Sequence, residues 1–86
     1  MRPREMRAEI QRRLQQKPFE PFRVQLPSGV THEVRYPQFT IVGEAVFAIG
    51  IVSADVVNPK YADYSVVLAW DEISSLEPLL PARVAN

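Results

Sequence analysis

Few side chains in this sequence could carry out acid–base or metal chemistry. Its 86 residues include one His and no Cys, which excludes thiolate nucleophiles, disulfides and zinc sites built from several Cys or His. His32 shares a face with apolar residues, and no nucleophile adjoins it. Asp71 and Glu72 are adjacent, so their carboxylates would diverge on a regular strand. We therefore expect no catalytic or metal site, no cofactor, and a protein that is not an enzyme.

These few polar groups are better explained by structural roles. His32 fits a rim or core position with one hydrogen bond. We interpret Asp71 as a corner residue whose carboxylate caps backbone N–H groups. Asp55 and Asp63 flank a predicted loop, where we expect them to be solvated. Most aromatic residues lie on apolar faces or beside Pro, which favours core or rim packing over base stacking; these are Phe19, Phe22, Phe39, Tyr64 and Trp70. We expect Tyr36 and Tyr61 to be the exposed aromatic residues.

A basic segment at the start of the chain is the main candidate for binding. Residues 1–17 hold six Lys and Arg against two Glu, whereas residues 18–86 hold four against eight, so the net charge of zero is a cancellation. Such a segment can bind phosphates or an acidic protein surface, or it can be a solvated helix face. The residues that we consider candidates for nucleic-acid or partner binding are Arg4, Arg7, Arg12, Arg13 and Lys17.

The elements that position these side chains follow from the spacing of the apolar residues. Met6, Ile10 and Leu14 recur every four residues, which predicts a helix ending near Gln16, before Pro18. Glu9 lies three and four residues before two Arg, which favours ion pairs. After Pro18 the alternation of apolar and polar residues predicts strands over residues 22–26, 30–36, 39–42, 45–52, 64–70 and 73–78. A turn at residues 27–29 and a loop over residues 53–63 separate them.

This order predicts a mainly β fold with one N-terminal helix: a small, strongly bent antiparallel sheet or barrel of five to six strands. We expect one domain over residues 1–78 and a flexible tail over residues 79–86. The strand from Ala45 to Val52 is apolar on both faces, so it needs cover from the helix, from barrel curvature or from another subunit. Its length of eight residues is far short of the roughly 20 that span a bilayer.

The layout resembles the Sm-like fold, one of the small β-barrels that include SH3-like barrels. The similarity lies in the Leu-x-x-Gly turn from Leu26 to Gly29, and in residues 68–78, where an apolar residue, a spacer, Asp71 and two later apolar residues follow the spacing of the second Sm motif. The resemblance implies a barrel that associates with its own copies. At the Arg-Gly positions of RNA-binding members this chain has Ala69 and Trp70, so the RNA pocket is not implied.

A second resemblance is to a family of short, uncharacterised bacterial proteins. They share a Pro-Phe-x-Pro-Phe motif, a Ser/Asp-Gly turn and a Val-Arg-His-Pro segment. These correspond here to residues 18–22, residues 28–29 and residues 34–37. Tyr36 stands where His is usual. This resemblance implies no activity.

The sequence as a whole predicts a non-catalytic interaction or assembly module. We expect a homo-oligomer that pairs through the strands Ala45 to Val52 and Tyr64 to Trp70. The alternative is an RNA- or nucleic-acid-binding protein that uses the Arg-rich helix. Because the first 17 residues lack an uninterrupted apolar stretch, we expect no secretion signal, no membrane partner and a cytoplasmic location.

Overall fold

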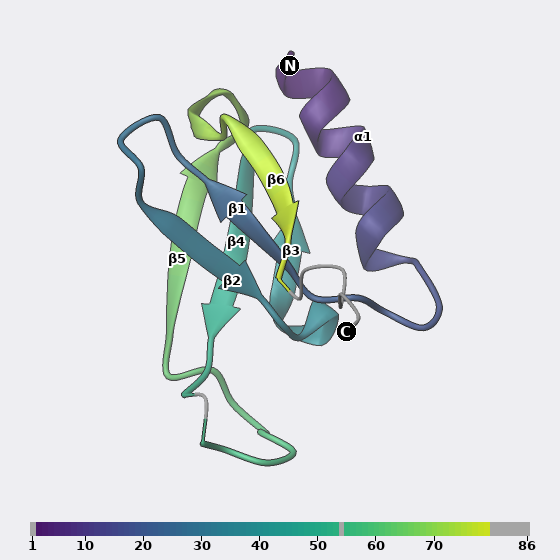
Figure 1. Cartoon of the computed structure of the whole chain (residues 1–86), viewed down its shortest axis with the longest axis vertical. Coiled ribbons are helices and arrows are strands. Elements are labelled where there is room, and N and C mark those ends of the chain that lie inside the picture. Colours follow the sequence, from purple (N-terminus) through teal and green to yellow (C-terminus); the bar gives the residue numbers. More distant parts are fainter. Residues whose placement is uncertain (1, 54, 80–86) are drawn as a thin grey trace, which may run out of the picture.

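One helix and six strands make up the described part of the chain, which in this computed structural model is residues 2–53 and 55–79. The elements are α1 (Pro3–Leu14), β1 (Phe22–Gln25), β2 (Thr31–Val34), η1 (Pro37–Phe39), β3 (Thr40–Val42), β4 (Val46–Ile51), β5 (Tyr64–Ala69), η2 (Trp70–Glu72) and β6 (Ser75–Pro78) (Figure 1). The prediction of a mainly β fold with one N-terminal helix is confirmed.

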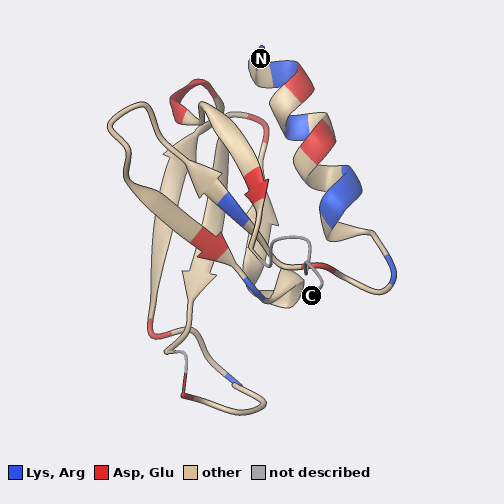
Figure 2. Cartoon of the chain, in the orientation of Figure 1, with Lys and Arg blue, Asp and Glu red and all other residues tan. Residues whose placement is uncertain are grey.

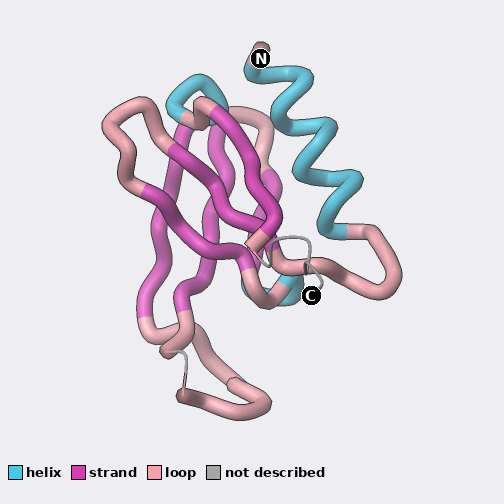
Figure 3. Tube along the Cα trace, viewed as in Figure 1, coloured by secondary structure: helices cyan, strands magenta, loops and turns pink. Residues whose placement is uncertain are grey.

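The strands form two antiparallel sheets of three strands each, in the orders β2-β1-β6 and β3-β4-β5, and neither closes into a barrel (Figure 3). The break between them lies at Pro37, which has no N–H to donate to a sheet. Here the chain makes a 3₁₀ turn in which the Phe39 N–H donates to the Tyr36 carbonyl over 3.0 Å. The turn separates β2 from β3, so the two strands belong to different sheets.

The core lies between the two sheets. Phe47 and Trp70 stack with ring centroids 5.4 Å apart and an angle of 17° between the ring planes. Both faces of the predicted strand at residues 45–52 are apolar, but only one of them is covered. Phe47 and Ile49 are fully buried, whereas Val46 on the other face is 39% exposed. The buried residues are Met6, Ile10, Phe22, Val24, Val34, Phe47, Ile49, Leu68, Trp70 and Ile73.

The helix α1 lies along one side of the sheets and buries Met6 and Ile10 in this core (Figure 1). Pro3 occupies its first turn, where the missing N–H costs no hydrogen bond. The helix ends at Leu14, two residues before the predicted end. The reason is that the Gln16 amide bonds to the carbonyl of Arg13, three residues back, which tightens the last turn.

The carbonyl of Gly43, in the turn between β3 and β4, joins three elements. It accepts a hydrogen bond from Arg7 Nε of α1 over 2.9 Å and another from Trp70 Nε1 of η2 over 3.0 Å. A carbonyl oxygen has two lone pairs, so these donors satisfy it fully. The helix is thereby fixed to the β3-β4-β5 sheet by polar contacts as well as by its apolar residues.

The loop between β4 and β5 projects from the end of the sheet (Figure 1). Asp63 holds its base, because Asp63 Oδ2 accepts from the Ser53 amide over 3.0 Å and from Ser53 Oγ over 2.7 Å. Asp63 is exposed, as predicted, and its carboxylate also fixes the base of the loop. Of the predicted tail, Leu79 donates its amide to the Pro21 carbonyl over 3.2 Å; residues 80–86 lie outside the described residues.

Candidate functional site

The Arg residues of the N-terminal segment are spread along α1, and Lys17 lies in the loop that follows it (Figure 2). The structure divides the five candidates into two groups. Arg7 donates to the Gly43 carbonyl, and Arg13 both pairs with Glu9 over 2.9 Å and lies over the Phe22 ring, 5.6 Å from its centroid. These two guanidinium groups hold the helix to the rest of the molecule.

The other three candidates, Arg4, Arg12 and Lys17, are exposed. Arg12 pairs with Glu9 over 2.6 Å. The hydrogen bond from Arg12 lowers the pKa of the Glu9 carboxyl, and the Glu9 carboxylate in turn raises the pKa of Arg12. The predicted pairing of Glu9 with both arginines is confirmed. It neutralises part of the basic surface, so Arg4 and Lys17 contribute most of the charge that remains for a partner.

A second candidate surface is the outer face of the β3-β4-β5 sheet. The register places Ile41, Ala48 and Val67 in one row across the three strands. Ile41 is 69% exposed and Val67 is 62% exposed. Val46 and Ala69 form a neighbouring pair on the same face. An apolar sheet face left open to water is typical of a surface that binds another protein.

At the β5 edge of the same sheet, no strand among the described residues pairs with β5. The Trp70 amide donates to the Ala45 carbonyl, which shows which residue pairs of the β4–β5 ladder are hydrogen-bonded. Because bonded pairs alternate along antiparallel strands, Val66 and Leu68 bond to β4, and the backbone groups of Ser65 and Val67 point away from it. Such an edge can pair with another strand. The sequence located this strand, but its place in the sheet depends on the pairing of all three strands.

One end of this β5 edge is closed by a side chain. Glu72 Oε1 accepts the Ala69 amide over 2.7 Å. Capping of backbone N–H groups at this corner was predicted, but for Asp71; Glu72 is the residue that does it, so that assignment is wrong. The signal in the sequence was the three-residue spacing between Ala69 and Glu72, which suits a carboxylate that reaches back to the start of a helical turn.

The outer edges of β6 and β3 offer fewer free amides. On β6, Pro78 has no N–H and the Ser74 amide donates to the Gln25 carbonyl. On β3, the Thr40 amide donates to the Pro37 carbonyl. β4, which the sequence suggested as a strand for pairing between subunits, is the central strand of its sheet. Its backbone already bonds to β3 and β5, so it can take part in an interface only through its outer face.

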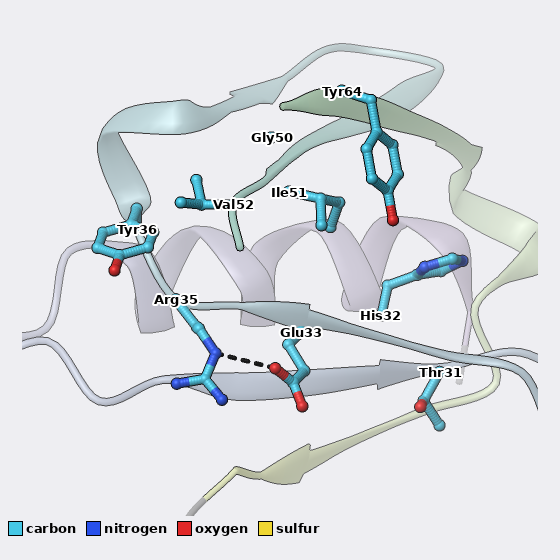
Figure 4. Close-up of a pocket in the computed structure, with 9 residues that line it drawn as sticks. All are labelled: Thr31, His32, Glu33, Arg35, Tyr36, Gly50, Ile51, Val52 and Tyr64. Atoms are coloured by element: carbon cyan, nitrogen blue, oxygen red, sulfur yellow. Dashed lines mark hydrogen bonds and ion pairs between the residues drawn. The ribbon is translucent and has the colours of Figure 1, made fainter. Parts of the chain in front are cut away.

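A cleft of about 200 Å³ separates the free edge of β2 from the end of β4 (Figure 4). Figure 4 shows His32 and Tyr64 pointing toward each other from the two sheets, with Ile51 beside them. Glu33 and Arg35 form an ion pair over 2.9 Å beside the cleft. His32 is half-buried at this rim. We call this the β2–β4 cleft; it is lined by Thr31, His32, Glu33, Arg35, Tyr36, Gly50, Ile51, Val52 and Tyr64.

Among residues 2–53 and 55–79, no group of three or more His, Asp or Glu side chains is arranged to hold a metal ion. Within the same ranges, no helix has the length and apolar character needed to cross a membrane. Comparison of the chain with protein-family models, with curated proteins and with solved structures found no match. The function must therefore be argued from the surfaces described above.

Proposed function

We propose that this protein is a non-catalytic assembly module that pairs with a second copy of itself along β5. The observation that carries the proposal is the free β5 edge, Ser65 and Val67, beside an exposed apolar sheet face. Two β5 strands related by a two-fold axis would place Ser65 of each copy opposite Val67 of the other. Each such pair exchanges two hydrogen bonds, and the axis generates a second pair.

The apolar face supports this mode of pairing. Ile41, Ala48 and Val67 lie in one row, and pairing at β5 would bring the rows of two copies together on a single six-stranded sheet. Phe47 of β4 would stay in the core of each copy. The interface would then involve strands 46–51 and 64–69, close to the contacts predicted at residues 45–52 and 64–70. The strand that pairs would be β5 and not β4, which contributes only its outer face.

The order of the strands also supports a barrel fold of the Sm-like or SH3-like kind. If β2 and β3 are taken as the two halves of one bent strand interrupted at Pro37, the order becomes β6, β1, β2/β3, β4, β5. This is the order of an antiparallel five-stranded barrel in which the 3₁₀ turn η2 connects β5 to the last strand. We propose that the two sheets are such a barrel, opened at one side.

The proposal is tested by light scattering coupled to gel filtration at tens of micromolar. We expect a mass twice the 9.8 kDa of the chain. Replacing Val67 by Lys would place two charges against each other across the axis, and we expect the variant to be a monomer. Val57→Lys is the matched control, because Val57 is 83% exposed and lies in the projecting loop.

A monomer for the unchanged chain would overturn the proposal. So would a Val67→Lys variant that keeps the mass of the unchanged protein while the Val57→Lys variant loses it. Val67→Pro gives a second test. The Val67 N–H faces away from β4, so this change removes a donor to the second copy and leaves the β4–β5 ladder intact.

A second candidate function, nucleic-acid binding, is favoured by the exposed charges of α1. Arg4 and Arg12 are eight residues apart, which is about 12 Å along a helix axis, and both are exposed. We expect this function to show as co-purified RNA, with an absorbance ratio at 260 and 280 nm above that of protein. The double variant Arg4→Glu, Arg12→Glu would then lose RNA binding while keeping its oligomeric mass; unchanged binding would reject α1 as the site.

A further inference from the structure

The β2–β4 cleft combines a free strand edge with an apolar floor and two aromatic walls. We infer that it binds an extended peptide segment, which would add as a strand to β2 and bury one large apolar side chain in the cleft. This site is distinct from the β5 edge on which the proposed self-association depends. The inference therefore goes beyond that function and fails or stands independently of it.

The backbone of β2 supplies the first part of the argument. The Leu26 amide donates to the Val30 carbonyl over 2.9 Å, which makes Val24 with His32 and Phe22 with Val34 the bonded pairs of the β1–β2 ladder. The N–H and C=O groups of Thr31 and Glu33 therefore face the cleft. No strand of the described residues pairs with β2 on this side. Backbone groups exposed in this way are the contacts that strand addition uses.

The residues that line the cleft show that it runs along the backbone edge of β2. Residues with side chains on both faces of β2 line it, His32 from the inner face and Thr31 and Glu33 from the outer face. Only a cavity that follows the backbone edge can contact both faces of one strand. In Figure 4 the Glu33 side chain points away from His32, as this alternation requires.

The opposite wall supplies the specificity. Ile51 and Val52 give an apolar floor, and the rings of Tyr36 and Tyr64 stand at its two ends (Figure 4). The cleft has a volume of about 200 Å³. An inward aromatic or branched aliphatic side chain would cover Ile51 and Val52 and displace water from them, which is favourable. A strand added to β2 directs every second side chain to this inner face.

The chemistry of the partner follows from these walls. Its inward residue is large and apolar. Its neighbours on either side project to the outer face, beside the Glu33–Arg35 ion pair, where small polar residues fit. In a strand added antiparallel to β2, as we infer here, the backbone N–H groups of these outward residues, and not that of the apolar residue, face β2. This alternation tells us which peptide nitrogens must be free to donate.

A synthetic heptapeptide with acetylated and amidated ends tests the inference. It has Thr at the four odd positions, Val at the second and sixth, and Phe at the fourth. Titration followed by amide chemical shifts should move the signals of Thr31, Glu33 and Tyr64. N-methylation at the third and fifth positions should weaken binding about fivefold for each hydrogen bond removed. N-methylation at the second and sixth positions, the matched control, should change the affinity less than twofold.

Three results would overturn the inference. The first is an absence of shifts at Thr31 and Glu33 with millimolar peptide. The second is equal loss of affinity from both patterns of methylation. The third is a single-stranded thymidine oligonucleotide that moves the same amides at a lower concentration than the peptide, which would make the cleft a nucleotide site.

A change in the protein gives an independent check. Thr31→Pro removes an N–H that faces the cleft, at the first position of a strand, where Pro is tolerated. We expect at least a fivefold loss of peptide affinity. Ser65→Pro makes the same change on the β5 edge and should leave peptide affinity unchanged. Peptide binding that survives Thr31→Pro with both variants folded would contradict the assigned edge.

Discussion

Glu9 is the residue with the clearest change in acidity. Hydrogen bonds from Arg12 and Arg13 hold the pKa of its carboxyl below the ordinary value of 4.5. We predict that Arg12→Ala raises the pKa of Glu9 toward that value, because the hydrogen bond with the larger effect on this pKa is lost. Carboxyl chemical shifts measured against pH would show it, with Arg4→Ala as a control that leaves the titration of Glu9 in place.

The same pair makes the stability of the protein depend on pH. A carboxyl whose pKa is lower in the folded state stabilises the fold above the unfolded value of 4.5, and the contribution is lost as the pH falls through the folded value. We predict that the difference in free energy of unfolding between the unchanged chain and Glu9→Gln is constant above about pH 6 and shrinks toward pH 3. Urea unfolding at a series of pH values measures it; a difference that grows on acidification would contradict the assignment.

The roles of some residues could be predicted from the sequence, and those of others could not. The spacing of Glu9 from Arg12 and Arg13 predicted their pairing, because neighbours on a helix are fixed by its geometry. The capping role given to Asp71 belongs to Glu72. Adjacent acids differ only in the direction in which the turn points them, and the sequence alone did not reveal that direction.

At the scale of the elements, the Gly43 carbonyl is the point where α1, η2 and the β3–β4 turn meet. We predict that Trp70→Phe, which keeps the ring beside Phe47 but loses the indole N–H, lowers the free energy of unfolding by about 1 kcal/mol. Arg7→Ala removes the other donor. The double variant should lose more than the two single losses together, because the carbonyl then has no donor at all. Urea unfolding of all three variants tests this, and strict additivity would contradict it.

The close approach of β4 to η1 and to the projecting loop depends on Gly50. A Cβ at this position would lie 2.8 Å from the Cβ of Phe39 and 2.9 Å from the Cβ of Ala62. We predict that Gly50→Ala destabilises the fold by about 1–3 kcal/mol, as overpacking does. In an Ala62→Gly background the same change should cost less, because one of the two contacts is removed. An equal cost in both backgrounds, measured by thermal unfolding, would show that Ala62 is not the obstacle.

The types of the elements were largely predictable, and their pairing was not. The four-residue spacing of Met6, Ile10 and Leu14 located α1, and alternation located the strands, because both periods are local properties of the backbone. The place of a strand in its sheet depends on contacts between distant residues. The sequence therefore did not show that β4 is central and β5 lies at an edge.

At the scale of the whole molecule, the charges of the two parts of the sequence have opposite signs. Opposite charges favour association of the helix of one copy with the strands of another. The exposed apolar row of Ile41, Ala48 and Val67 favours contact between sheets instead. We predict that raising NaCl from 0.05 to 0.5 M leaves the dissociation constant of the dimer unchanged or lowers it. Sedimentation measurements that show weakening with salt would favour the helix, because screening affects charged contacts.

The carboxylate of Glu72 on the Ala69 amide has a consequence for how far assembly can proceed. It shortens the available edge to Ser65 and Val67, while Pro78 and the Thr40 turn block the edges of β6 and β3. For two-fold pairing along β5 the molecule is monovalent, and a second copy occupies that edge. Because a two-fold contact is closed, growth through β5 terminates at two chains and does not continue into a filament.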